Sequence, residues 1–139
     1  MKIRYINLPI IFFALLVSAC TGSNPSSTVD LEDHTWVLTD LNGIDPLDGH
    51  RPTLEFKANQ VTGNTGCNHY GGSYHIEGDT IRIEDLFYTE MACLDPAGIM
   101  EQETAFLSLL QSVGAYTING NNLTLQTGAG KTLIQASAG

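Results

Sequence analysis

The amino-acid sequence predicts an α+β fold: a small, barrel-like antiparallel sheet of about eight strands, with one helix inserted between strands five and six. Short runs in which β-branched or aromatic residues alternate with polar residues recur between residues 36 and 134. Turn-forming residues separate these runs, and such short links favour antiparallel hairpins. One segment, residues 96–113, has a helical pattern instead. Closure into a barrel is then the simplest way to remove exposed strand edges.

Residues 1–19 have the pattern of an export signal that is removed. Lys2 and Arg4 precede an apolar stretch, residues 8–17, that is too short to span a bilayer. Small residues then lead directly into Cys20, which resembles the lipobox of bacterial lipoprotein signal peptides. This resemblance implies cleavage before Cys20 and lipidation of its thiol, which would anchor the chain stably. The alternative is an ordinary secretion signal that is cut elsewhere.

Residues 20–29 are expected to form the lipidated cysteine and a flexible tether, because the stretch after Cys20 is polar, turn-forming and without periodicity. Thr21 stands where an aspartate is the usual inner-membrane retention signal in enterobacteria. The lipobox resemblance therefore implies a bacterial cell-envelope location, on the outer membrane and facing the periplasm or the cell surface. Residues 30–139 are left as one domain.

The mature chain from residue 20 would carry 4 Lys and Arg residues against 15 Asp and Glu residues, a formal net charge of −11. Such a surface repels nucleic acid and anionic lipid headgroups at long range. We therefore expect no nucleic-acid partner and contact with the membrane only through the lipid anchor. A protein partner or client fits the charge balance, and the domain is expected to be a monomer.

The eight predicted strands follow one another at near-regular spacing. They cover residues 36–39, 53–56, 60–62, 73–76, 80–83, 116–118, 123–125 and 132–134. Turn residues such as Asn42-Gly43, Ala58-Asn59 and Gly78-Asp79 separate consecutive strands. The predicted elements are therefore joined by hairpins rather than by long crossovers.

The predicted helix runs from Pro96 to Val113, with Asp95 as its N-cap and Gly114 at its end. Its apolar stripe comprises Ile99, Phe106, Leu110 and Val113, with Leu109 beside it. Glu101, Gln102 and Glu103 are expected on the solvent side of the early turns. The helix should therefore pack one face against the sheet.

Several stretches occur in the order and spacing of a known family. They are HTWVLTDLNG, PTLEF, VTGNTGCNHYGGSY, YTEMAC, QETAFLSLL and LTLQT, and they extend over essentially all of residues 33–135. On these motifs the domain resembles the META domain family, which includes heat-inducible, HslJ-like bacterial lipoproteins. The resemblance implies a small β-barrel-like domain with one helix. It implies little about chemistry, since members are associated with heat shock, antibiotic tolerance and, in some organisms, virulence or motility.

Cys67 and Cys93 are the two cysteines left if Cys20 is lipidated, and thiols pair in an oxidising periplasm. A bond between them would close a loop whose entropy is worth about 3.5 kcal/mol. A nucleophilic Cys67 would need a base, and His69 cannot easily fold back onto it along an extended strand. A metal site with His69 and His75 lacks any supporting ligand spacing. We therefore predict a disulfide, with no catalytic residue, metal or cofactor.

The stretch at residues 61–74 is rich in glycine and carries the candidate binding surface. Its glycines, Gly63, Gly66, Gly71 and Gly72, are expected to allow bends or bulges in a tightly coiled sheet. Polar and aromatic residues crowd the same stretch, and loops often carry function. The candidate binding surface is Asn68, His69, Tyr70 and Tyr74.

The absence of a recognisable catalytic motif predicts a non-enzymatic, lipid-anchored envelope protein. It would act in envelope or heat stress by binding a protein or a ligand. The alternative is a small β-barrel inhibitor of a lysozyme-type hydrolase, or a carrier of a small ligand. Trp36 and Phe56 could line a ligand pocket, but such aromatic residues are expected in the core.

Overall fold

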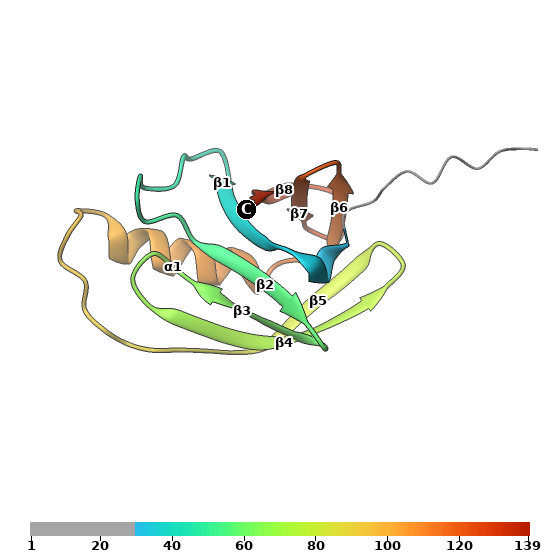
Figure 1. The fold of residues 1–139 in the computed structure, drawn as a ribbon, viewed down its shortest axis with the longest axis horizontal. Coiled ribbons are helices and arrows are strands. Elements are labelled where there is room, and N and C mark those ends of the chain that lie inside the picture. The colour runs from blue at the N-terminus through green and yellow to red at the C-terminus, as the bar shows by residue number, and fades with distance from the viewer. Residues whose placement is uncertain (1–29) are drawn as a thin grey trace, which may run out of the picture.

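The computed structural model describes residues 30–139, and it confirms the predicted fold. A short 3-10 helix, Leu31–Asp33, precedes eight strands and one α-helix (Figure 1). The elements are β1 (Thr35–Leu41), β2 (Thr53–Lys57), β3 (Gln60–Asn64), β4 (His69–Glu77), β5 (Thr80–Tyr88), α1 (Ile99–Leu110), β6 (Ala115–Asn119), β7 (Asn122–Gln126) and β8 (Thr132–Ala138). The predicted signal peptide, the tether and Cys20 lie outside the described residues.

The strands form one antiparallel ring in chain order, and β1 pairs with β8 to close it. The weakest seam of this ring lies between β5 and β6, where the register contains a single pair, Thr80 with Ala115. Figure 1 shows β6, β7 and β8 gathered on one side of the molecule, apart from the long β4–β5 hairpin. The helix α1 is the connection between the two strands of this seam.

The interior of the ring is filled by large side chains because the strands alternate inward and outward residues. Trp36 and Phe56 are completely or almost completely buried, as predicted. The indole N–H of Trp36 donates to the carbonyl of Leu31, 3.0 Å away, so its one polar group is satisfied. The ring therefore encloses a packed core rather than a hollow.

Glycines relieve crowding where β4 meets its neighbours. A Cβ on Gly71 would lie 2.6 Å from the ring of Phe87, which covers this position from β5. A Cβ on Gly63 would collide with the backbone carbonyl of Thr53. The β4–β5 register shifts between Gly71 and Ser73, which is the bulge expected of the glycine-rich stretch.

The helix is shorter than predicted and begins differently. It begins at Ile99, with Gly98 as its N-cap in the left-handed region at φ 88°. The residues before it form a turn in which the N–H of Ile99 donates to the carbonyl of Pro96. Asp95 as the N-cap was therefore wrong, because this turn separates it from the first helical residue.

The C-terminal end of the helix also differs from the prediction. The helix ends at Leu110, and the N–H of Val113 donates to the carbonyl of Leu110 in a following turn. The predicted stop at Gly114 is therefore too late. A Cβ on Gly114 would lie 2.6 Å from the backbone nitrogen of Gly128, so this glycine serves a close backbone contact instead.

The polar face of the helix was predicted wrongly at two of its three positions. Glu101 is exposed, but Gln102 and Glu103 are only 8% and 5% exposed. Both side chains face the segment that joins β3 to β4, where they have hydrogen-bond partners. The buried side of α1 is therefore wider than its apolar stripe.

Candidate functional site

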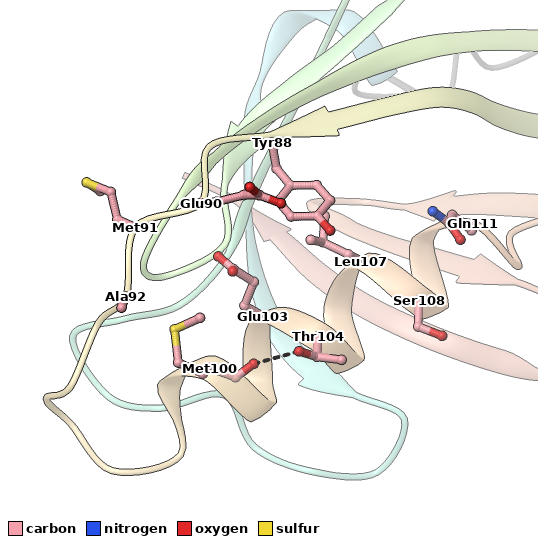
Figure 2. A pocket seen from close by; sticks show the side chains of 10 residues that line it. All are labelled: Tyr88, Glu90, Met91, Ala92, Met100, Glu103, Thr104, Leu107, Ser108 and Gln111. Atoms are coloured by element: carbon pink, nitrogen blue, oxygen red, sulfur yellow. Dashed lines mark hydrogen bonds between the residues drawn. The ribbon is translucent and has the colours of Figure 1, made fainter.

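A depression on the surface lies between the end of β5 and α1, and we call it the β5–α1 groove. It has a volume of about 460 Å³. It is lined by Tyr88, Glu90, Met91, Ala92, Met100, Glu103, Thr104, Leu107, Ser108 and Gln111 (Figure 2). Figure 2 shows Tyr88 lying over Leu107, while Met91 points away from the helix. One wall is therefore the segment after β5 and the other is a side of α1.

Exposed apolar side chains are concentrated beside this groove. Of the large hydrophobic residues that are exposed in residues 30–139, all but Ile44 lie between Phe87 and Leu94. Tyr88 is 46% exposed, Met91 56% and Leu94 91%. Single exposed apolar residues are common, but a contiguous set typically marks an interaction site.

The segment that carries these side chains is fixed by one buried residue, Asn68. Its Oδ1 accepts hydrogen bonds from the N–H of Met91 and the hydroxyl of Thr89, both at 2.9 Å. Its Nδ2 donates to the carbonyl of Met91 and to Oε1 of Glu103, both at 3.1 Å. These four contacts use the two donors and two acceptor positions of a carboxamide. Asn68 therefore links β4, the segment after β5 and α1.

Glu103 completes this polar cluster from the helix. Its Oε2 accepts a hydrogen bond from the hydroxyl of Thr65, and its Oε1 accepts from Asn68. The hydroxyl oxygen of Thr65 in turn accepts from the N–H of Asn68 at 2.8 Å. Both carboxylate oxygens of a nearly buried glutamate are thus bonded, which offsets the cost of removing it from water. We call Asn68, Glu103 and Thr65 the Asn68 cluster.

Gln102 joins α1 to the opposite loop. Its Oε1 accepts from the N–H of Leu47 at 2.7 Å, and its Nε2 donates to the carbonyl of His50 at 2.8 Å. Gly66 lies against the same pair, since a Cβ there would be 2.5 Å from the His50 carbonyl oxygen and 2.8 Å from Nε2 of Gln102. Gln102 and Glu103, adjacent on α1, therefore hold two different segments in place. Gln102 holds the loop between β1 and β2, and Glu103 holds the segment between β3 and β4.

A disulfide also fixes the segment after β5, which the Asn68 cluster already holds. The structure joins Cys67 to Cys93 with their Cα atoms 6.0 Å apart. Cys67 precedes Asn68, and Cys93 follows Met91 by two residues. The covalent bond and the Asn68 cluster therefore act on the same two stretches of chain, and neither sulfur is a free thiol for nucleophilic attack or metal binding.

The predicted binding surface is corrected by the burial of three of its four residues. Asn68 is 0% exposed, and Tyr70 and Tyr74 are also buried, whereas His69 is exposed. Two of the four lie on β4 with inward-facing side chains, and Asn68 is held beneath the segment after β5. These residues cannot form an exposed face.

The two tyrosines have structural partners. The Tyr70 hydroxyl donates to the carbonyl of Thr53 at 2.8 Å, and burial raises its pKa well above the usual range. The Tyr74 hydroxyl donates to the Glu32 carboxylate, and burial followed by this glutamate raises the pKa of Tyr74 to about 12. Both phenols therefore stay protonated at neutral pH.

Sequence reasoning missed the groove residues Tyr88, Glu90 and Met91. Their one signal in the sequence was the YTEMAC stretch, residues 88–93, which places apolar residues and a glutamate beyond the predicted strand 80–83.

Within residues 30–139, no group of three or more His, Cys, Asp and Glu side chains is placed to hold a metal ion. No helix in that part of the chain is both long and apolar enough to cross a membrane.

Replacement of Asn68 by Ala should lower the free energy of unfolding by about 2–4 kcal/mol, because it leaves several buried polar groups without partners. Urea unfolding of the purified protein measures this loss. His69→Ala is the matched control, since the neighbouring side chain is exposed, and it should change the value by less than about 0.5 kcal/mol. Equal effects of the two substitutions would contradict the role given to Asn68.

The double variant Cys67→Ser with Cys93→Ser should be less stable than the oxidised protein by about 3 kcal/mol, because the unfolded chain regains the entropy of the closed loop. A reductant should lower the melting temperature of the wild-type protein and leave that of the double variant unchanged. Alkylation of the unreduced protein at both positions would show that the bond is absent.

Comparisons with known proteins agree with this architecture. The family profile described as the META domain matches residues 29–139. A protein solved by NMR superposes with a TM-score of 0.60 at 26% identity, covering 77% of this chain and 91% of that one. An NMR structure of a protein from Burkholderia xenovorans gives 0.59 at 26%, covering 78% and 83%.

A third structure shares the fold alone. It is the crystal structure of a DUF4847 family protein from Bacteroides vulgatus, with a TM-score of 0.55, 20% identity, and coverage of 77% of this chain and 93% of that one. No curated protein matches the chain significantly. Since the matched profile spans all of the described barrel and helix, the chain belongs to the META domain family.

Proposed function

We propose that this chain is a non-enzymatic binding protein, held in the bacterial envelope by a lipid on Cys20, that binds segments of other proteins in the β5–α1 groove. The observation that carries the proposal is a short stretch, residues 87–94, that exposes four large apolar side chains beside a groove of about 460 Å³. The segment bearing them is held in place by the Asn68 cluster and the disulfide. An ordered apolar surface of this kind suits binding.

The non-enzymatic part of the proposal rests on how the reactive groups are used. The two cysteine sulfurs of residues 30–139 are bonded to each other. The Glu103 carboxylate, which lies in the groove wall, has both oxygens occupied by hydrogen bonds from Asn68 and Thr65. A disulfide supplies no thiolate nucleophile, and the hydrogen bonds of Glu103 give this carboxylate a structural role.

The envelope part of the proposal rests on the lipobox-like residues that end at Cys20 and on the disulfide, which suits an oxidising compartment. A lipid at Cys20 and the tether to residue 29 would hold the barrel just off the outer membrane, on its periplasmic side or at the cell surface. An anchored protein that holds exposed chain segments would act in envelope or heat stress, when unfolded chains accumulate.

Inhibition of a cationic hydrolase is the second candidate function, and it is favoured by the net charge of −11 of residues 20–139. A lysozyme-type enzyme would be attracted to such a surface. Transport of a small ligand inside the barrel is less well supported, because Trp36, Phe56 and their neighbours fill the interior.

A binding experiment with lysozyme separates the two functions. We expect the purified protein to bind lysozyme that has been reduced, blocked with iodoacetamide and labelled with a fluorophore, as followed by anisotropy. Native lysozyme should keep its full activity in the presence of the protein. Stoichiometric inhibition of the native enzyme, without binding of the unfolded chain, would favour the inhibitor function.

Matched variants locate the binding surface. Tyr88→Ala combined with Met91→Ala should weaken binding of unfolded lysozyme about tenfold, since two exposed apolar contacts are lost. Ile44→Ala removes an even more exposed apolar side chain elsewhere and should have little effect. If Ile44→Ala weakens binding as much as the groove variant does, the groove is not the site.

Replacement of Cys20 by Ser should release the protein from membranes, because the thiol that receives the lipid is lost. Cell fractionation measures this change, with the wild-type protein expected in the outer-membrane fraction. Unchanged membrane partitioning of Cys20→Ser would contradict the anchor.

A further inference from the structure

We infer that the free edge at the end of β5, from Tyr88 to Glu90 just beyond the strand, takes an extended, basic segment of another protein as an added strand that lies in the β5–α1 groove. The inference deepens the proposed function and rests on it, since it names how the groove binds and which segments it prefers.

The edge of β5 that faces away from β4 is largely unpaired. The β5–β6 register contains only Thr80 with Ala115. Two backbone hydrogen bonds flank this pair, from the N–H of Ile81 to the carbonyl of Gly114 and from the N–H of Tyr116 to the carbonyl of Asp79. Beyond Ile81, the strand pairs with β4 alone among the described residues. An unpaired strand edge is a template for another chain.

The hydrogen-bond alternation shows which backbone groups are free. The N–H of Thr89 donates to the carbonyl of His69 on β4, and Gly71 pairs with Phe87 two positions earlier. Along an antiparallel strand, residues alternate between directing their N–H and C=O groups to the partner strand, as Phe87 and Thr89 do, and directing them to the opposite edge. Tyr88 and Glu90 therefore direct theirs away from β4, and in residues 30–139 no other segment bonds to them.

The groove lies where an added strand would pass. Tyr88 and Glu90 line it from one side, and Leu107 and Met100 line it from α1 (Figure 2). Its volume of about 460 Å³ leaves room for side chains between the two walls. Main-chain hydrogen bonds to the edge would supply affinity, and apolar contacts with the walls would add to it.

The charge of the groove selects the occupant. Its only charged lining residues are Glu90 and the nearly buried Glu103, so a lysine or arginine of the added strand would meet the exposed carboxylate of Glu90. A second copy of this chain fits poorly, because pairing of two identical edges would place the Glu90 carboxylates of both copies on the same short ladder. The occupant is therefore a basic extended segment of a different protein.

Hydrogen exchange with a synthetic probe tests the inference. The probe is a blocked octapeptide of alternating Val and Lys, and its control is an octapeptide of alternating Val and Glu. We expect the Val-Lys peptide to bind the ¹⁵N-labelled protein more tightly. At a free concentration ten times its Kd, the amides of Tyr88 and Glu90 should exchange about tenfold more slowly, while those of Phe87 and Thr89 should be unchanged.

A charge variant with a matched control completes the test. Glu90→Gln should weaken binding of the Val-Lys peptide about two- to fivefold. Glu77→Gln removes another exposed carboxylate, at the other end of the β4–β5 hairpin, and should leave binding unchanged.

Four outcomes would overturn the inference, and the last of them would overturn the proposed function too. Binding of the Val-Lys peptide without protection of Tyr88 and Glu90, or equal binding of the Val-Glu peptide, would overturn the added basic strand and leave the proposed function in place. The same holds if neither peptide binds while unfolded lysozyme does. If neither the peptides nor unfolded lysozyme bind, the proposed function fails as well.

Discussion

The Asn68 carboxamide is the constraint on which the rest of this surface depends. It lies inside the protein with all its hydrogen-bonding capacity used, and its partners come from α1 and from the segment after β5. A buried amide tolerates little displacement, since each broken bond leaves a polar group unsatisfied. The position of Met91 relative to the helix is thereby fixed. The Cys67–Cys93 disulfide fixes the same stretches covalently.

This arrangement explains how the barrel exposes apolar residues and stays ordered there. The core is complete without them, because large inward side chains from the strands and α1 fill the interior. Phe87 covers Gly71 on the outer face, and Tyr88 lies over Leu107 (Figure 2). The seam between β5 and β6 is opened by the helix, which leaves a strand edge and a groove side by side. The exposed apolar side chains, the free edge of β5 and the β5–α1 groove thus all follow from the insertion of one helix between β5 and β6.

The fold was largely predictable and the site was not. Alternation such as that of Thr53–Phe56 and the turns between strands specify the strands locally, and every predicted strand exists. Glu103 was misplaced because its charge suggested solvent, although it lies four residues from Ile99 and three from Phe106 on the buried stripe. Asn68 was misplaced because sequence cannot show that a distant segment covers it. Its partners, Met91 and Glu103, come from tertiary contacts more than 20 residues away.

The exchange rate of the Met91 amide in the unliganded protein tests this account most directly. Its N–H donates to the buried Oδ1 of Asn68, while the neighbouring amides of Glu90 and Ala92 have no such partner in the described residues. The account predicts that Met91 exchanges as slowly as residues of the core strands, between two neighbours that exchange quickly. A Met91 amide that exchanges as fast as Glu90 would mean that Asn68 does not hold this segment, and the ordered binding surface would be contradicted.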